Sequence, residues 1–124
     1  MGRYYNGDIE GKFWFAVQSS DDADFFGVTG NTPNYLNYYF DKSNLKSIEK
    51  GIKECKKELY GYKGKINNFF NLNQSYTDEM LANALNVKEG EAKTFLMWYA
   101  RLVLGEKILA CVKKNGSCDF DAEL

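Results

Sequence analysis

Carboxylates near the start of the chain are the side chains whose types and spacing best suit chemistry. They lie on both sides of a predicted strand: Asp8, Glu10, Asp21, Asp22 and Asp24. Clustered carboxylates can bind Mg²⁺ or Ca²⁺, and paired carboxylates can perform acid–base catalysis without histidine. However, residues 21–27 lack the calcium-loop pattern with its Glu at the twelfth position, and Ser19 and Ser20 are ordinary helix caps. We interpret the segment as structural, with Asp21, Asp22 and Asp24 as secondary candidates for a metal site.

The chain contains no histidine. This absence excludes imidazole-based zinc sites, Ser/His and Cys/His nucleophile pairs, and histidine acid–base catalysis. The cysteines Cys55, Cys111 and Cys118 lie far apart, form no CxxC pair, and follow no signal peptide. The sequence therefore predicts an intracellular protein with reduced thiols and no cofactor, and it favours a non-enzymatic role.

Charge and hydropathy restrict the classes of partner. The chain has 16 basic and 17 acidic residues and a net charge of −1. This balance disfavours recruitment to nucleic acid or to anionic membranes by bulk electrostatics. No apolar run approaches the roughly 18 residues that a membrane span requires. We therefore expect a protein partner and no membrane.

Residues 81–92 offer a second kind of chemistry, nucleic-acid recognition. Their sequence, LANALNVKEGEA, resembles the core of a helix-turn-helix, with the turn at Asn86-Val87. The start of the second helix would enter the major groove, but here it carries Glu89 and Glu91, which repel phosphates. We favour a structural role and keep nucleic-acid binding through residues 77–104 as the alternative.

Aromatic residues are the third group of candidates. The chain has nine Tyr, nine Phe and two Trp, and Tyr and Trp are common at binding surfaces. If one face of the predicted sheet packs on helices, the other face keeps rings and few charges, which is typical of an interaction surface. The candidate interaction residues are Tyr4, Tyr5, Trp14, Tyr35, Tyr38 and Tyr39.

Two aromatic segments must form the sheet that carries these rings. Residues 12–17 and 35–40 alternate large apolar side chains with other residues, which predicts two strands. A tight turn at Asn6-Gly7 is expected to fold residues 3–5 back as an edge strand. The sequence thus predicts two or three antiparallel strands.

The middle of the chain is predicted to be helical. Residues 45–69 place apolar side chains at alternating spacings of three and four, which is one stripe of a helix. Ser43 is the expected N-cap, and glycines at 61 and 64 are expected to break the helix. Residues 67–74 then form a polar connection before a helix over residues 77–85.

The last long segment, residues 89–114, is apolar on most sides, which predicts a helix central to the core. Gly105 is expected to divide it, and Asn115-Gly116 to end it. The alternative is a hairpin around Asn115-Gly116, in which residues 108–114 pair with residues 117–124. In the helical interpretation, residues 117–124 form an acidic, mobile tail.

These elements together predict a single α+β domain over residues 1–124. A small antiparallel, aromatic-rich sheet in the N-terminal half packs against three to four helices. Residues 1–42 are the β-rich part, residues 43–116 the helical part, and residues 117–124 the acidic tail.

Residues 2–27, GRYYNGDIEGKFWFAVQSSDDADFFG, resemble the opening of small uncharacterised proteins of large nucleocytoplasmic DNA viruses, the giant viruses. The likeness covers about a fifth of the chain, and the family has no established catalytic residues to transfer. The resemblance implies a viral protein made in an infected cell. Its expected location is the host cytoplasm or nucleus, or the virion.

The function that we predict is a non-enzymatic protein-interaction module of viral type. It either self-associates as a homodimer or docks on a host or viral protein. The alternatives are a nucleic-acid-binding protein that uses the helix-turn-helix-like segment 77–104, and a carboxylate-based, metal-dependent enzyme.

Overall fold

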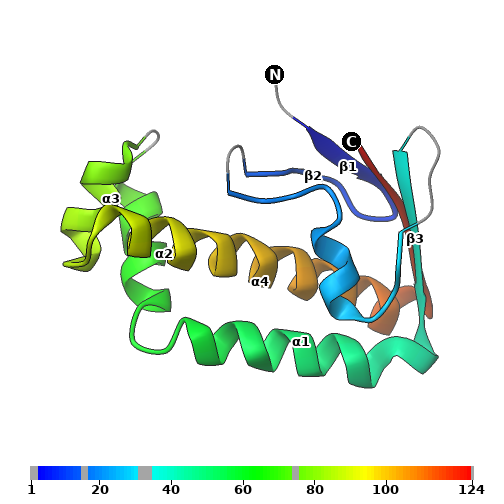
Figure 1. Cartoon of the computed structure of the whole chain (residues 1–124). Coiled ribbons are helices and arrows are strands. Elements are labelled where there is room, and N and C mark those ends of the chain that lie inside the picture. Colours follow the sequence, from blue (N-terminus) through cyan, green and yellow to red (C-terminus); the bar gives the residue numbers. More distant parts are fainter. Residues whose placement is uncertain (1–2, 15–16, 31–34, 74–75, 124) are drawn as a thin grey trace.

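The computed structural model describes residues 3–14, 17–30, 35–73 and 76–123. Within these residues it contains four strands, four α-helices and two short 3₁₀ helices. The strands form one antiparallel sheet at one end of the molecule, and the α-helices extend away from it (Figure 1). The predicted aromatic-rich α+β fold is confirmed.

The sheet has the strand order β2-β1-β4-β3, and each strand is antiparallel to its neighbours. Its members are β1 (Tyr4–Gly7), β2 (Gly11–Lys12), β3 (Tyr35–Asp41) and β4 (Ser117–Glu123). The prediction of a strand over residues 35–40 is confirmed by β3. The first and last segments of the described chain pair side by side, since β1 and β4 are neighbours.

The C-terminal segment is an inner strand, so the prediction of a mobile acidic tail is wrong. Cys118, Phe120 and Ala122 are buried at alternate positions of β4, which gives the segment the two-residue period of a half-buried strand. The hairpin alternative is also wrong, because residues 108–114 belong to a helix and β4 pairs with β1 and β3.

The N-terminal strands differ from the prediction in two ways. The strand β1 lies between β2 and β4 and is not an edge, and Gly7 continues it with a φ of 149°, against the backbone of Phe120. The strand expected over residues 12–17 ends at Lys12, because the carbonyl of Trp14 accepts from the amide of Gln18 and closes a turn. Residues 15–16 of that expected strand lie outside the described part.

Four α-helices follow β3: α1 (Leu45–Glu58), α2 (Lys63–Leu72), α3 (Asp78–Leu85) and α4 (Glu89–Asn115). The predicted break between α1 and α2 is confirmed, and Gly61 within it has a φ of 83°. The prediction of a polar connection over residues 67–74 is wrong for residues 67–72, which belong to α2. Burial of Phe69 against the core stabilises the helix over this stretch.

The helix ends are only partly as predicted. The N-cap is Asp41 rather than Ser43. The Asp41 carboxylate accepts a hydrogen bond from the backbone N–H of Ser43 at 2.9 Å, and a 3₁₀ turn then leads into α1. Gly116 ends α4 with a φ of 85°, as predicted. Gly105 does not divide α4, because the ring of Phe26 packs where a side chain at 105 would lie.

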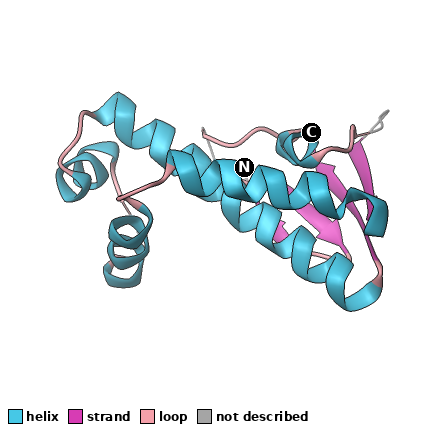
Figure 2. Cartoon of the chain, turned by 90° about the horizontal axis from the view of Figure 1, so that it is seen from below, coloured by secondary structure: helices cyan, strands magenta, loops and turns pink. Residues whose placement is uncertain are grey.

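The core lies where α4 meets α1 and the inner face of the sheet. The helix α4 packs along α1 and against β3 and β4 (Figure 2). Rings of Tyr38, Phe40 and Phe120 stack on the inner face of the sheet, and all three are buried. None of the helices that the structure describes covers the opposite face of the sheet, where alternate residues of β3 and β4 are exposed or half-buried. No helix among the described residues is long and apolar enough to cross a membrane.

Candidate functional site: the open face of the sheet

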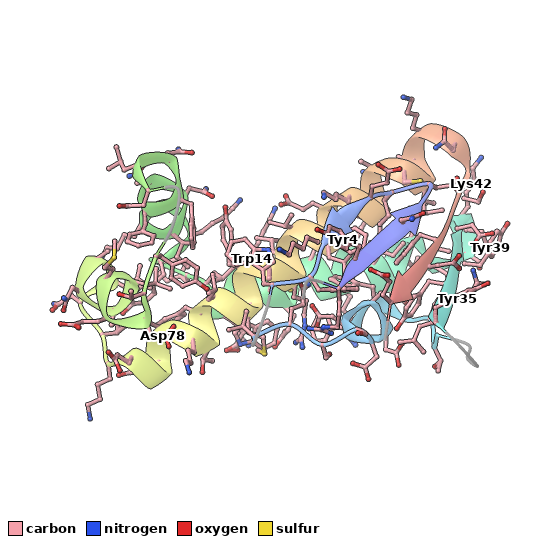
Figure 3. All side chains as sticks on the ribbon, turned by 90° about the horizontal axis from the view of Figure 1, so that it is seen from above. Tyr4, Trp14, Tyr35, Tyr39, Lys42 and Asp78 are labelled. Atoms are coloured by element: carbon pink, nitrogen blue, oxygen red, sulfur yellow. The ribbon has the colours of Figure 1, made fainter. Side chains whose placement is uncertain are left out.

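Strand alternation divides the six candidate aromatic residues into two groups. Tyr4, Tyr35 and Tyr39 are 50%, 48% and 51% exposed, on the side of the sheet away from the helices. Figure 3 shows Tyr35 and Tyr39 on β3 at the sheet end of the molecule, and Tyr4 on β1, on the other side of β4. These three rings lie on a free surface.

The other three candidates have structural positions. Tyr5 and Tyr38 are buried on the inner face. Trp14 is half-buried and packs edge-to-face on Phe70, at a centroid distance of 5.1 Å, and on Tyr99, at 6.1 Å. Trp14 therefore joins the N-terminal loop to the helices, and the structure does not bring these three residues to the free surface.

Three carboxylates of β4 lie between the exposed tyrosines. In the β3–β4 register, Tyr35 is opposite Glu123, and Tyr39 is opposite Asp119. Asp121 lies midway between them, so neighbouring carboxylates are about 7 Å apart along the strand. We call this surface the open face; it consists of Tyr4, Tyr35, Tyr39, Asp119, Asp121 and Glu123.

Hydrogen bonds hold the carboxylates of the open face in place. The side-chain amide of Asn37 donates to Asp119 Oδ1 at 2.9 Å and to Asp121 Oδ1 at 3.0 Å. The backbone N–H of Tyr4 donates to Glu123 Oε1 at 2.7 Å. None of the three carboxylates forms an ion pair within 4 Å in the described part of the chain. Within the described residues, these carboxylates are thus held by hydrogen bonds and not by ion pairs.

The open face is hollowed where strands meet. A hollow of about 370 Å³ is lined by Tyr4, Tyr35 and Glu123, among others. A neighbouring hollow of about 390 Å³ includes Asp119 and Asp121. At the edge of the face, the Lys12 ammonium lies 5.9 Å from the centroid of the Tyr4 ring. The face thus offers carboxylates and ring faces together, and both attract cations.

The acidic loop after the first strands is occupied by internal contacts. Asp22 pairs with Arg101 at 2.7 Å, and Asp24 accepts from the Tyr38 hydroxyl at 2.5 Å. Asp21 accepts from a nearby serine at 2.5 Å. The three carboxylates thus bind different partners, and the described residues contain no group of three or more side chains suited to a metal ion.

Burial makes several ionisable groups of the core resist ionisation. It raises the pKa of Tyr38, and the hydrogen bond to Asp24 raises it further. Burial also raises the pKa of the Cys55 thiol to about 12 and raises that of Cys118. All three cysteines are buried free thiols, and the raised pKa values disfavour a thiolate nucleophile at Cys55 and Cys118.

The helix-turn-helix-like segment does form, as α3, a turn and α4. Asn86 has a φ of 57°, and Leu81 and Leu85 are buried against the start of α4. The exposed first turn of α4 carries Glu89 and Glu91. This arrangement supports packing between the two helices and presents acids where a DNA-binding helix would present cations.

Sequence reasoning missed Asn37 and the three β4 carboxylates as site residues. The available signal was the alternation of apolar and acidic residues from 118 to 123. No family model, curated protein or solved structure matches this chain. The viral resemblance of residues 2–27 therefore stays a prediction, and a functional proposal must rest on the geometry of the open face.

Proposed function

We propose that this chain is a non-enzymatic protein-interaction module whose docking surface is the open face. The row Asp119, Asp121 and Glu123 carries the proposal, because it lies among half-exposed tyrosines and has no ion-pair partner within the described residues. Like charges about 7 Å apart along one strand repel each other weakly in water. A binding partner that supplies cations removes this repulsion.

The partner is a protein segment that carries Lys or Arg, supplied by a host or viral protein or by a second copy. Cationic side chains complement the carboxylates and bind the faces of the tyrosine rings. In an extended segment, side chains at alternate positions are about 7 Å apart, which is also the spacing of the carboxylates along β4. The tyrosines supply most of the binding energy, and the carboxylates set orientation and association rate.

A synthetic extended peptide with Lys at alternate positions is a direct probe of this proposal. Its binding is measured by fluorescence anisotropy at low salt, against a control peptide with Glu at the same positions. We expect only the lysine peptide to bind. Neutralising Asp121→Asn with Glu123→Gln should weaken it by about tenfold.

The matched control is Glu79→Gln with Glu106→Gln, which removes the same charge from exposed helical positions. A second variant, Tyr35→Thr with Tyr39→Thr, removes the rings but keeps β-branched strand residues. If the lysine peptide binds the open-face variants as tightly as the wild-type chain, or if both peptides bind equally, the proposal is wrong.

A further inference from the structure

The helix α1 carries a second charged surface, of opposite sign. Its core side presents Ile48, Ile52 and Cys55, which are buried. Exposed lysines at spacings of four, three and four residues lie on the opposite side of the helix: Lys46, Lys50, Lys53 and Lys57. We call this row the lysine stripe. None of its members forms an ion pair within 4 Å in the described part of the chain.

The lysine stripe carries more positive charge than an amphipathic helix requires, because such a helix needs only polar residues on its outer face. Like charges three or four residues apart destabilise a helix by a few tenths of a kcal/mol per pair, and Glu49 and Glu54, at the same spacings from the lysines, offset part of this repulsion. The whole helix has five lysines and three glutamates, whereas the whole chain has a net charge of −1. Positive charge is therefore concentrated on α1 and negative charge elsewhere, including the open face.

We propose that the open face of one copy of this chain binds the lysine stripe of a second copy. This inference rests on the proposed function and names the partner. From Lys46 to Lys57 the helix rises by eleven steps of 1.5 Å, or about 16 Å. From Asp119 to Glu123 the strand rises by four steps of about 3.4 Å, or about 14 Å. The two rows are thus close in length and opposite in charge.

The positions of the two surfaces determine the kind of assembly. The lysine stripe lies opposite the buried side of α1. That buried side packs along α4, which runs beside α1 in Figures 1 and 2. The open face lies on the side of the sheet away from the helices. Because each copy contributes two different patches, the contact is head-to-tail, and it continues from copy to copy unless a ring closes. Lysine stems pack on the tyrosine rings while their ammonium groups reach the carboxylates.

Sedimentation velocity of the full chain tests this assembly over a range of concentrations, at 50 mM and 500 mM NaCl. We expect the average mass to rise above 14.2 kDa with concentration at low salt and to return to that value at high salt. The helix variant Lys50→Glu with Lys53→Glu should stay monomeric. The face variant Asp119→Lys with Asp121→Lys should also stay monomeric.

Mixing the two variants is the decisive measurement. The helix variant keeps an intact open face, and the face variant keeps an intact lysine stripe, so an equimolar mixture should associate although neither variant does alone. The control variants Lys65→Glu with Lys113→Glu, and Glu79→Lys with Glu106→Lys, reverse the same number of exposed charges elsewhere and should associate like the wild-type chain. Circular dichroism confirms that each variant is folded. If Asp119→Lys with Asp121→Lys does not fold, Asp121→Asn with Glu123→Gln replaces it.

A wild-type chain that stays monomeric overturns the proposal, as does a salt-insensitive dimer that the variants leave intact. A helix variant that still associates but loses binding to a duplex oligonucleotide also overturns it, and assigns the stripe to phosphates. If the lysine peptide binds the open face while the chain stays monomeric, only the identity of the partner is wrong. If neither the peptide nor a second copy binds, the proposed function fails as well.

Discussion

The substitution Asp22→Asn tests whether Asp22 in the acidic loop stabilises the fold as a structural clamp, an ion pair that joins the loop to Arg101 of α4, or belongs to a ligand site. The Asp22 side chain is 2% exposed, and its Oδ1 lies 2.7 Å from Nε of Arg101, whose side chain is 18% exposed. The Arg101 guanidinium also lies over the rings of Phe25 and Trp98, at 4.4 and 4.8 Å from their centroids. Loss of the carboxylate charge therefore leaves a cation that water reaches poorly.

The hydrogen-bond partners increase the expected effect. The other Asp22 oxygen, Oδ2, accepts from the side-chain amide of Gln18 at 2.8 Å. Gln18 cannot turn its amide round without losing the bond that its Oε1 accepts from the N–H of Trp14. An Asn at position 22 that accepts from Arg101 must therefore point its own NH₂ group at the NH₂ group of Gln18.

Removing one partner of a buried ion pair costs about 3–5 kcal/mol, and an unsatisfied buried donor costs about 1–3 kcal/mol. Asn keeps one acceptor for Arg101, and that side chain keeps some exposure, so we expect a loss of about 2–4 kcal/mol in the free energy of unfolding. This is a large fraction of the roughly 5–15 kcal/mol that stabilises a domain.

Urea unfolding followed by circular dichroism measures this loss. The control Asp21→Asn removes a charge from the neighbouring, exposed residue and should change stability by at most about 0.5 kcal/mol. A double-mutant cycle adds Arg101→Met, which should lower the free energy of unfolding much less in the Asp22→Asn variant than in the wild-type chain. A loss below about 1 kcal/mol, or additive costs, would refute the clamp. So would a thermal shift with Mg²⁺ or Ca²⁺ that Asp22→Asn abolishes.

Two further predictions concern the core. Gly105→Ala should lower the free energy of unfolding by about 1–3 kcal/mol, because the added Cβ would overlap the ring of Phe26. The control Gly90→Ala adds a Cβ that meets nothing within 4 Å, so it should be neutral or slightly stabilising. Urea unfolding compares the two variants, and equal effects would contradict the packing argument. Stability should also fall at high pH, because the folded chain keeps the protons of Cys55 and Tyr38 above the ordinary pKa values of 9.0 and 10.0, where the unfolded chain releases them. Each group lowers the free energy of unfolding by up to about 1.4 kcal/mol for each pH unit above its ordinary pKa. Urea midpoints that stay constant from pH 9 to 11 would contradict this prediction.

The helical part of the fold could be predicted because helices depend on local periodicity. The apolar stripe of α1, the break at Gly61 and the end of α4 at Gly116 are each determined by residues within a few positions. The errors within the helices come from long-range contacts. Phe26 lies far from Gly105 in the chain, and only the packed core shows why that glycine lies in an unbroken helix.

The N-terminal strands were harder to predict because their pairing depends on distant residues. Aromatic alternation over residues 12–17 satisfied the local rule for a strand. In the structure, Phe13 turns into the core and Trp14 packs on α2 and α4, so the chain leaves the sheet after Lys12. Tertiary contacts with rings that follow much later in the sequence therefore override the local strand preference.

The carboxylates of the open face show why the site itself was missed. Taken alone, Asp119, Asp121 and Glu123 indicate a solvated chain end, because acidic residues are depleted in strands. The alternating Cys118, Phe120 and Ala122 bury one side of the segment, and that burial places all three acids on the other side. Only pairing with β1 and β3 then brings the acids beside the tyrosines. An acidic chain end that alternates with apolar residues should therefore be tested as a strand first, because the strand predicts a charged binding face where the tail predicts none.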